Sequence, residues 1–493
     1  MPRRLMIKKS LRSSPAWLIV FNLIFILSST ALPNEDEKAP HKVGLKSNTA
    51  AKGDAGSGNA IVYTYSAACP QSAAFKLKAG GKDVFVYKTS AGDFAAFAIT
   101  GAVTVEIETD APAANVRVAP ARHKITPEMR GNKMMLQMQQ PAHLLIEIDG
   151  LPQLFLYVDA PDTNMPAPSA PGVHFYAAGQ IYTVGEIRLQ DNEIIYIEGG
   201  AVVRGCIRAT SVKNIRIAGR GILDGSHSQP RGTRRRSILL EGCCQSVVED
   251  IVIIEPSAWM VVLGACQDVL VRNIKELGER AGSDGIDIVG SRQIRVENCI
   301  CRSGDDCIAI KSLDLRPHDP DATMDYSLDV HDIQISGCAL LSNRGGQAME
   351  IGHELRTASV SDIRFLNIDV LGVHQFGAPF GIHNADRATV SDVIYENIRV
   401  EHHYDKLVDF RIIKSRWSRD IERGCIRNIT LDNIDVAISV YNPGYTCSLI
   451  GGYDAQHGIE HIQFNNFRLN GKPALSADDL DLYCKHAIDI SFR

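Results

Sequence analysis

Three aspartates suggest the chemistry of this chain. Asp305 and Asp306 stand side by side in the largely apolar segment RSGDDCIAIKS, and Asp284 precedes them in GSDGIDIVGS, where Asp287 is a fourth candidate. Burying unpaired charge is costly, so carboxylates in such segments need a partner or a function. Carboxylates held close together raise each other's pKa, which leaves one protonated as an acid while another is ionised as a base. Hydrolysis of a glycosidic bond needs both states, whereas a calcium site is the competing interpretation because carboxylates also bind hard cations.

Short strands that recur along the second half of the chain would position these aspartates. The pattern apolar-any-apolar-any-Asn-apolar occurs in VLVRNI, IRVENC, IRFLNI, VIYENI, ITLDNI and IQFNNF. These segments start at residues 269, 294, 363, 393, 429 and 462, and related segments start at 215, 251 and 333. Repetition at such spacings is typical of a solenoid. The alternation of apolar residues indicates that each coil consists of short strands.

The asparagine of each repeat fits a bend between strands, because Asn tolerates the left-handed conformation. These residues are Asn273, Asn298, Asn367, Asn397, Asn433 and Asn466. We therefore predict an all-β chain whose residues 172–493 form a right-handed parallel β-helix. Asp284 precedes Asp306 by 22 residues, which is close to one short coil. Asp284 is thus expected on the strand next to Asp305 and Asp306, one spacing of ~4.8 Å away.

The residues before the repeats divide into three segments. A basic start, an apolar run and small residues are typical of a signal peptide, which we place at residues 1–31. Residues 32–59 are polar and are expected to form a flexible linker. Short alternating runs separated by Gly, Pro and Asp predict a small β-sandwich at residues 60–160. The chain is accordingly expected to be secreted or periplasmic, with no stable membrane insertion after cleavage.

The net charge and the cysteines limit the classes of ligand that the protein is expected to bind. The formal net charge of -5 argues against nucleic acid, which calls for a basic surface. Twelve cysteines in an exported chain predict a few disulfides, but the absence of a CxxC pair argues against structural zinc. We expect a monomer that uses no metal and no cofactor.

The segment SGDDCIAIKS, together with the preceding SDGID, resembles the polygalacturonase family, glycoside hydrolase family 28. The similarity spans about residues 176–472 and includes GRGILDGS at residues 219–226, which is typical of the early coils. The resemblance implies a right-handed parallel β-helix that cleaves pectic polysaccharides with inversion. It also implies that Asp305 is the general acid, and that Asp284 and Asp306 activate the attacking water.

The substrate-binding motifs of the family are matched less closely. Where the family has Gly-His-Gly, this chain has RGGQAMEIGHE, so Gly346 or Gln347 stands at the position of the histidine and His353 is displaced. The family's Arg-Ile-Lys is RIIK here, from Arg411 to Lys414, and the extra residue would turn its two ends to opposite faces unless a bulge intervenes. The substrate-binding residues that the resemblance implies are Gln347, His353, Arg411, Lys414 and Lys311.

Several alternatives follow from these departures. A rhamnogalacturonan fragment or a neutral glycan is as consistent with the sequence as plain polygalacturonate. A calcium-dependent polysaccharide lyase and a non-catalytic β-helix that binds glycans are the competing functions. Trp259 and Trp417 are candidates either for stacking on sugar rings or for internal packing. Four histidines of the late coils are expected in loops that face the same cleft: His374, His383, His402 and His403.

Overall fold

The computed structural model describes residues 58–110, 115–227, 235–317, 321–438 and 447–493. Within these ranges the chain is all-β, with three single-turn 3₁₀ helices: η1 (Ala121–His123), η2 (Gly225–His227) and η3 (Asp478–Leu480). The predicted signal peptide and all but the last two residues of the predicted linker lie outside the described residues. No helix in the described ranges has the length and apolar character needed to span a bilayer.

The first eleven strands form two sheets around one core. The six-stranded sheet consists of β1 (Asn59–Val62), β4 (Val86–Thr89), β5 (Gly92–Thr100), β7 (Val116–Ala119), β10 (Ala142–Ile148) and β11 (Leu154–Asp159). The five-stranded sheet consists of β2 (Phe75–Ala79), β3 (Lys82–Val84), β6 (Val103–Thr109), β8 (Glu128–Arg130) and β9 (Lys133–Met138). In β6 the side chains alternate between buried and half-buried, which is the pattern of a strand with one face against a core. The small sandwich of the predicted fold is therefore present.

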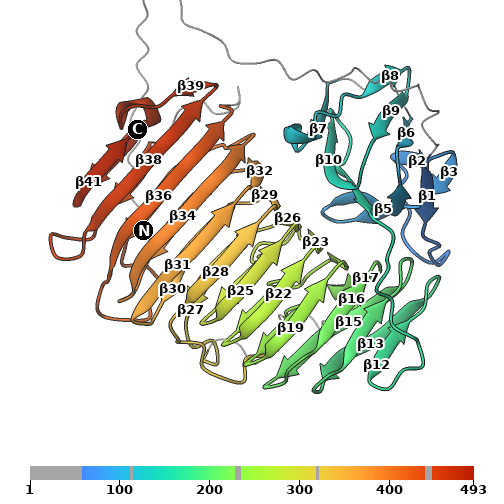
Figure 1. Cartoon of the computed structure of the whole chain (residues 1–493), viewed down its shortest axis with the longest axis horizontal. Helices are drawn as coiled ribbons and strands as arrows, with labels where there is room; N and C mark the ends of the chain where they lie inside the picture. The colour runs from blue at the N-terminus through green and yellow to red at the C-terminus, as the bar shows by residue number, and fades with distance from the viewer. Residues whose placement is uncertain (1–57, 111–114, 228–234, 318–320, 439–446) are drawn as a thin grey trace, which may run out of the picture. The chain divides into compact units, whose positions relative to one another are not determined.

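The remaining strands wind into coils whose strands stack in three parallel ladders (Figure 1). Ladder 1 consists of β12 (Val173–Tyr176), β14 (Ile194–Ile197), β16 (Arg216–Gly219), β19 (Cys244–Glu249), β22 (Gln267–Arg272), β25 (Arg292–Glu297), β28 (His331–Ser336), β31 (Ser359–Leu366), β34 (Thr389–Val400), β36 (Cys425–Val436), β38 (Ile459–Leu469) and β41 (Ala487–Phe492). Ladder 2 consists of β13 (Ile181–Leu189), β15 (Val202–Thr210), β17 (Ile222–Asp224), β20 (Val252–Ile254), β23 (Lys275–Leu277), β26 (Ile300–Ser303), β29 (Ala339–Ser342) and β32 (Asp369–Val373). Ladder 3 runs from β15 through β18 (Ile238–Glu241), β21 (Val261–Gly264), β24 (Ile286–Val289), β27 (Ile308–Ser312), β30 (Met349–Leu355), β33 (Phe380–Asn384), β35 (Val408–Ile412) and β37 (Ser448–Gly451) to β40 (Leu482–Lys485), and a short β39 (Lys472–Pro473) pairs with β38. This arrangement confirms the predicted right-handed parallel β-helix.

The repeat found in the sequence corresponds to ladder 1. From residue 269 onward, the first residues of the repeats are direct register partners: Val269, Ile294, Ile333, Ile363, Val393, Ile429 and Ile462. The start at Ile251 was wrong, because Ile251 directly precedes β20 of ladder 2 while Ser246 is the partner of Val269. The strands of both ladders are apolar and alternating, so the pattern alone does not separate them.

The recurrent asparagines occupy the bend between ladders 1 and 2. All six have positive φ, between 45° at Asn466 and 57° at Asn397, as the left-handed prediction requires. The side-chain amide of Asn433 donates to Asn397 at 2.5 Å, and that of Asn466 donates to Asn433 at 2.8 Å. The asparagines thus form a ladder of their own in the last coils.

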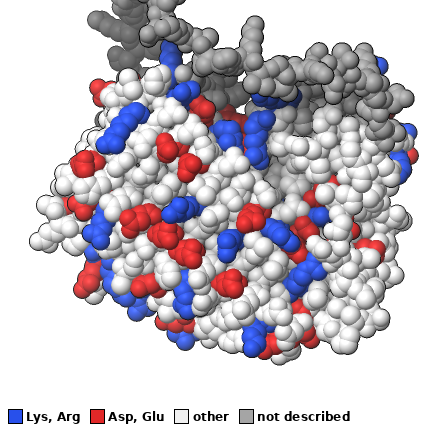
Figure 2. All heavy atoms as spheres, viewed as in Figure 1, with Lys and Arg blue, Asp and Glu red and all other residues white. Residues whose placement is uncertain are grey.

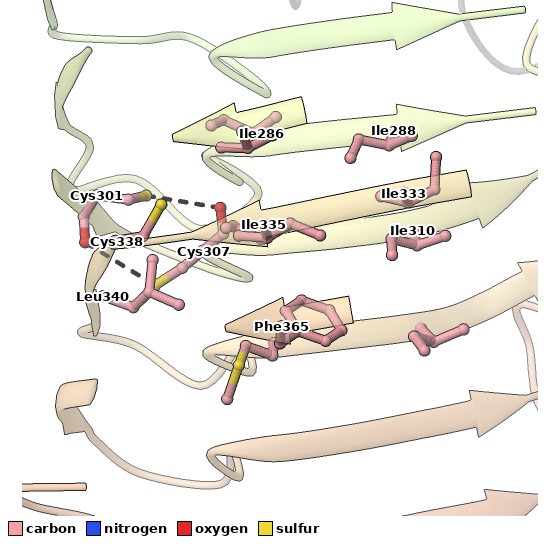
Figure 3. Packing of buried hydrophobic residues seen from close by; sticks show 14 of the residues in the cluster. Ile286, Ile288, Cys301, Cys307, Ile310, Ile333, Ile335, Cys338, Leu340 and Phe365 are labelled. Carbon is pink, nitrogen blue, oxygen red and sulfur yellow. Dashed lines mark hydrogen bonds between the residues drawn. The ribbon is translucent and has the colours of Figure 1, made fainter. Parts of the chain in front are cut away.

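All twelve cysteines are free, so the prediction of a few disulfides was wrong. Six of them belong to the apolar core of the coils, and Figure 3 shows Cys301, Cys307 and Cys338 among isoleucine and leucine side chains. Cys299 and Cys338 each direct the thiol to the carbonyl of the residue two positions earlier, at 3.4 Å. In this fold cysteine therefore acts as a small apolar residue that also donates a weak hydrogen bond.

The sandwich packs against ladder 2. Phe94, Phe155 and Tyr157 share an apolar cluster with residues of β17, β20, β23, β26, β29 and β32. Ion pairs border this contact, among them Arg117 to Glu401 at 2.9 Å. Over the face shown in Figure 2, acidic and basic side chains are interspersed, with no extended basic region. The bends between ladders 2 and 3 carry the residues of interest below.

Candidate active site

The three aspartates lie in two consecutive bends that lead into ladder 3. Asp284 precedes β24, and Asp305 and Asp306 lie between β26 and β27. β24 and β27 pair with Ile286 opposite Ile308, which places Asp284 beside Asp306. The amide of Gly285 donates to the carbonyl of Asp306 at 2.9 Å and fixes this alignment. The separation of 22 residues in the sequence is thus one turn of the solenoid.

Each aspartate carboxylate is held by a different donor. Asp305 Oδ2 accepts the backbone N–H of Gly282 at 3.0 Å, and Asp306 Oδ1 accepts that of Gln347 at 2.7 Å. Asp284 Oδ2 accepts from the ammonium of Lys311 at 2.8 Å. Burial, together with the negative charge of Asp284, raises the pKa of Asp305 to about 6 and raises the pKa of Asp306 well above its ordinary value. The trio therefore retains at least one proton in mildly acidic solution.

Lys311, predicted to bind substrate, is buried between two carboxylates. Its Nζ donates to Asp284 at 2.8 Å and to the fully buried Asp287 at 2.7 Å, and it lies 4.0 Å from the ring centre of Trp259. Burial alone would lower the pKa of Lys311, but these carboxylates outweigh it and raise the pKa. The ammonium thus occupies the place that a cation would take between Asp284 and Asp287, which argues against the calcium interpretation.

The three aspartates line a pocket of about 470 Å³. Its lining residues are Trp259, Ala281, Gly282, Asp284, Asp305, Asp306, Lys311, Gly345, Gly346, Gln347, His353, Glu354, Arg416 and Trp417. A volume of this order accommodates a sugar ring and water, since small-molecule sites span roughly 300–1,000 Å³. Of the two tryptophans, Trp259 packs against the cations of Lys311 and Arg236, whereas Trp417 is 41% exposed. Trp417 is therefore the more accessible of the two rings for a sugar, although the guanidinium of Arg416 lies 4.6 Å from its centre.

Gly346 and Gln347 support the aspartate bend from the next coil. The amide of Gln347 binds Asp306, and its side-chain oxygen accepts the amide of Ala378 one coil further on. Ser342 Oγ donates both to the carbonyl of Asp305 at 3.0 Å and to that of Gly346 at 2.9 Å. Gln347 thus lines the pocket, but its side-chain oxygen accepts a backbone hydrogen bond from Ala378.

Replacing Gly346 with Ala is expected to lower kcat about a hundredfold while the protein stays folded. A Cβ at Gly346 would lie 2.0 Å from the carbonyl carbon of Asp305 and 2.1 Å from the nitrogen of Asp306, so the aspartate bend must shift. A displacement of about 1 Å in a catalytic group costs on the order of 10² in rate. Steady-state kinetics and circular dichroism measure the two effects. In the matched variant Gly451→Ala the new Cβ meets only Arg411 Cγ at 3.8 Å, and equal loss in both variants would contradict this expectation.

His353 and His383 form a stacked pair beside the pocket. Their rings lie 4.5 Å apart and within 6° of parallel. His383, expected in a loop, is instead buried in β33, because its Nδ1 faces Glu350 at 2.8 Å and its Nε2 faces Asp409 at 3.3 Å. Burial favours the neutral ring, but these two carboxylates raise the pKa of His383 to about 9, whereas burial and the charge of His383 lower the pKa of His353 to about 4. His353 therefore presents a neutral ring at the pocket wall.

Glu350, His353 and His383 also place their ligand atoms within 4.8 Å of one another, as a metal site would. Imidazole binds a metal through a lone pair in the plane of the ring. In two parallel stacked rings these lone pairs lie in separate planes and cannot meet at one ion. With both nitrogens of His383 facing carboxylates, the cluster fits an imidazolium between two anions better than a metal site.

The structure does not bring Arg411 and Lys414 to the pocket, whose lining includes neither residue. Arg411 lies at the end of β35 and pairs with Asp409, to which its Nη2 donates at 2.8 Å. Lys414 is exposed in the loop that follows β35. The predicted substrate clamp is therefore displaced, and the extra residue of RIIK is accommodated because Lys414 is not part of the strand.

Sequence reasoning missed two charged residues of the pocket, Glu354 and Arg416. Glu354 is the last residue of RGGQAMEIGHE, the segment in which the sequence indicated Gln347 and His353 instead. Arg416 lies two residues beyond RIIK, in a loop whose path no periodicity constrains. The alternation of apolar residues along the strands does not predict that either residue lines the pocket.

Comparison with known proteins identifies the family of this chain. The model of glycosyl hydrolases family 28 matches residues 185–440. Polygalacturonases from Juniperus ashei and Chamaecyparis obtusa align at 24% identity over 157 residues and 34% over 65 residues; these alignments cover 31% and 13% of this chain, and 27% and 13% of the relatives' lengths.

Among solved structures, Dex49A from Penicillium minioluteum superposes with a TM-score of 0.62 at 13% identity, covering 88% of this chain and 97% of the other. The family 28 exopolygalacturonase of Yersinia enterocolitica gives a TM-score of 0.46 at 12% identity, covering 86% and 96%. The first of these establishes the shared fold. Because the family model covers more than half of the chain, the chain belongs to family 28 of the glycosyl hydrolases.

Proposed function

We propose that this protein is a glycoside hydrolase that cleaves glycosidic bonds in pectic polysaccharides or oligosaccharides with inversion of the anomeric carbon. Asp305 is the general acid in this proposal, and Asp284 with Asp306 activates the attacking water. The observation that carries the proposal is the convergence of three carboxylates from two consecutive coils on one open pocket. The names of the two polygalacturonase relatives support a pectic substrate.

The protonation states suit these roles. With a pKa of about 6, Asp305 keeps its proton in mildly acidic solution and can pass it to the leaving oxygen. The ammonium of Lys311 donates a hydrogen bond to Asp284 at 2.8 Å and so fixes the position of this side chain. The raised pKa of Asp306 makes its ionised form a stronger base than an ordinary aspartate. In a single displacement, water would then attack the anomeric carbon as the bond to the leaving oxygen breaks, with one carboxylate taking the proton of the water.

Product analysis on defined pectic oligosaccharides tests this function. We expect new reducing ends in the presence of a chelator and no ultraviolet absorbance from an unsaturated product. Proton magnetic resonance early in the reaction should show the anomer opposite to that of the substrate. An unsaturated product would indicate a lyase, whereas binding without any product would indicate a glycan-binding protein. A product anomer equal to that of the substrate would contradict inversion.

A further inference from the structure

The pocket is lined by more acidic than basic side chains. Its ionisable side chains, apart from His353, are Asp284, Asp305, Asp306, Glu354, Lys311 and Arg416. Lys311 is committed to Asp284 and Asp287, and Glu354 lies 3.5 Å from Arg419. An acidic sugar that enters this pocket therefore meets several carboxylates and needs a cation that is still available.

Arg416 is that cation. It is exposed, lines the pocket, and has no carboxylate within ion-pair distance among the described residues. Its guanidinium lies 4.6 Å from the ring centre of Trp417, which also lines the pocket. A cation held over an aromatic face is restrained in position. The loop that follows β35 thus directs an oriented guanidinium and a large ring at the same space as Asp305.

Three other cations at or near β35 are already paired or do not line the pocket. Arg411 donates to Asp409, and Lys406 lies 2.5 Å from Asp405 and 3.7 Å from Asp409. Lys414 is not among the residues that line the pocket. Arg presents a planar fork that binds a carboxylate through two parallel hydrogen bonds, which a lysine cannot do.

We propose that Arg416 binds the carboxylate of a uronate sugar in the catalytic pocket, with Trp417 against the sugar ring, and so determines selectivity for acidic over esterified or neutral chains. This inference rests on the proposed function. It replaces the Arg411 and Lys414 pair that the sequence suggested as the clamp.

The test compares a galacturonate oligomer with its fully methyl-esterified counterpart at about pH 5, where Asp305 is protonated. In Arg416→Gln we expect KM for the free acid to rise about tenfold to a hundredfold, with KM for the ester nearly unchanged. Arg416→Lys should recover part of the loss, because the charge remains while the fork is lost. Lys414→Gln tests the clamp that the sequence suggested, and Arg295→Gln on ladder 1 is the matched control. Both variants should leave the ratio of KM for the acid to KM for the ester unchanged.

Two failures are distinguishable. If the wild type cleaves neither oligomer, the proposed function fails, and calorimetric binding of the same two oligomers to the same variants then tests Arg416 by itself. If the wild type cleaves the acid but Arg416→Gln keeps the preference for acid over ester, the inference about Arg416 is wrong. A larger loss in Lys414→Gln than in Arg416→Gln would likewise overturn it.

Discussion

Replacing Asp305 with Asn is expected to lower kcat by about 10²–10⁴ without unfolding the protein. Asn has nearly the same shape and can still accept the Gly282 amide at its side-chain oxygen, but it cannot give a proton to the leaving oxygen. General acid catalysis contributes a factor of this size. Single-turnover kinetics on a pectic oligosaccharide, with the thermal midpoint as the measure of folding, checks both parts.

The pH profile supplies an independent check on Asp305. Because the acid form is the active one, kcat/KM of the wild type should fall tenfold per unit as the pH rises above about 6. The residual activity of Asp305→Asn should lack this decline. Asp362→Asn is the matched control, because Asp362 is exposed on ladder 1 and does not line the pocket. Its positive φ is also one that Asn tolerates. Full activity of Asp305→Asn would refute the assignment of the acid.

Replacing Lys311 with Met is expected to lower both stability and activity. The change leaves Asp284 and Asp287 buried without their shared cation, and removing one partner of a buried ion pair costs about 3–5 kcal/mol. Asp287 then takes up a proton more readily, because Lys311 no longer lowers its pKa, and Asp284 loses the donor that positions it. Urea unfolding measures the free energy of unfolding, and kcat/KM measures the loss of the base.

Two further variants separate the effects of Lys311. The double variant Lys311→Met with Asp287→Asn removes one of the stranded carboxylates, so it should recover part of the stability while remaining nearly inactive. Lys213→Met, at an exposed lysine on another face, should change stability by no more than about 0.5 kcal/mol. An unchanged unfolding midpoint in Lys311→Met would show that the buried pairs contribute nothing.

The sequence predicted those parts of the fold that depend on repetition. Alternating apolar residues and the recurrent Asn identified ladder 1 from Val269 onward, since each coil must place the same kind of residue over the previous one. The neighbouring position of Asp284 and Asp306 followed because the intervening coil has only short bends. In such a coil, a separation of one coil length in the sequence places two residues side by side on neighbouring strands.

The remaining site residues depend on features without a period. Arg416 reaches the pocket through a loop, and the path of a loop depends on its own contacts rather than on the repeat. His383 is buried because Glu350 and Asp409 lie on the two adjacent strands, β30 and β35, and β30 itself pairs irregularly with β27 between Ile351 and Leu355. A one-residue shift there changes which side chains face each other. No spacing in the sequence reports such a shift.

The register of ladder 3 has a consequence for how this enzyme can diversify. Asp284, Asp305 and Asp306 belong to the rungs of β24 and β27, whereas Arg416 and Trp417 come from the loop after β35, three rungs beyond β27. In the proposed mechanism, bond breaking and sugar choice are thus encoded in separate parts of the chain. Descendants could exchange residues 413–424 for a different loop and acquire a new substrate while inheriting the hydrolytic machinery intact.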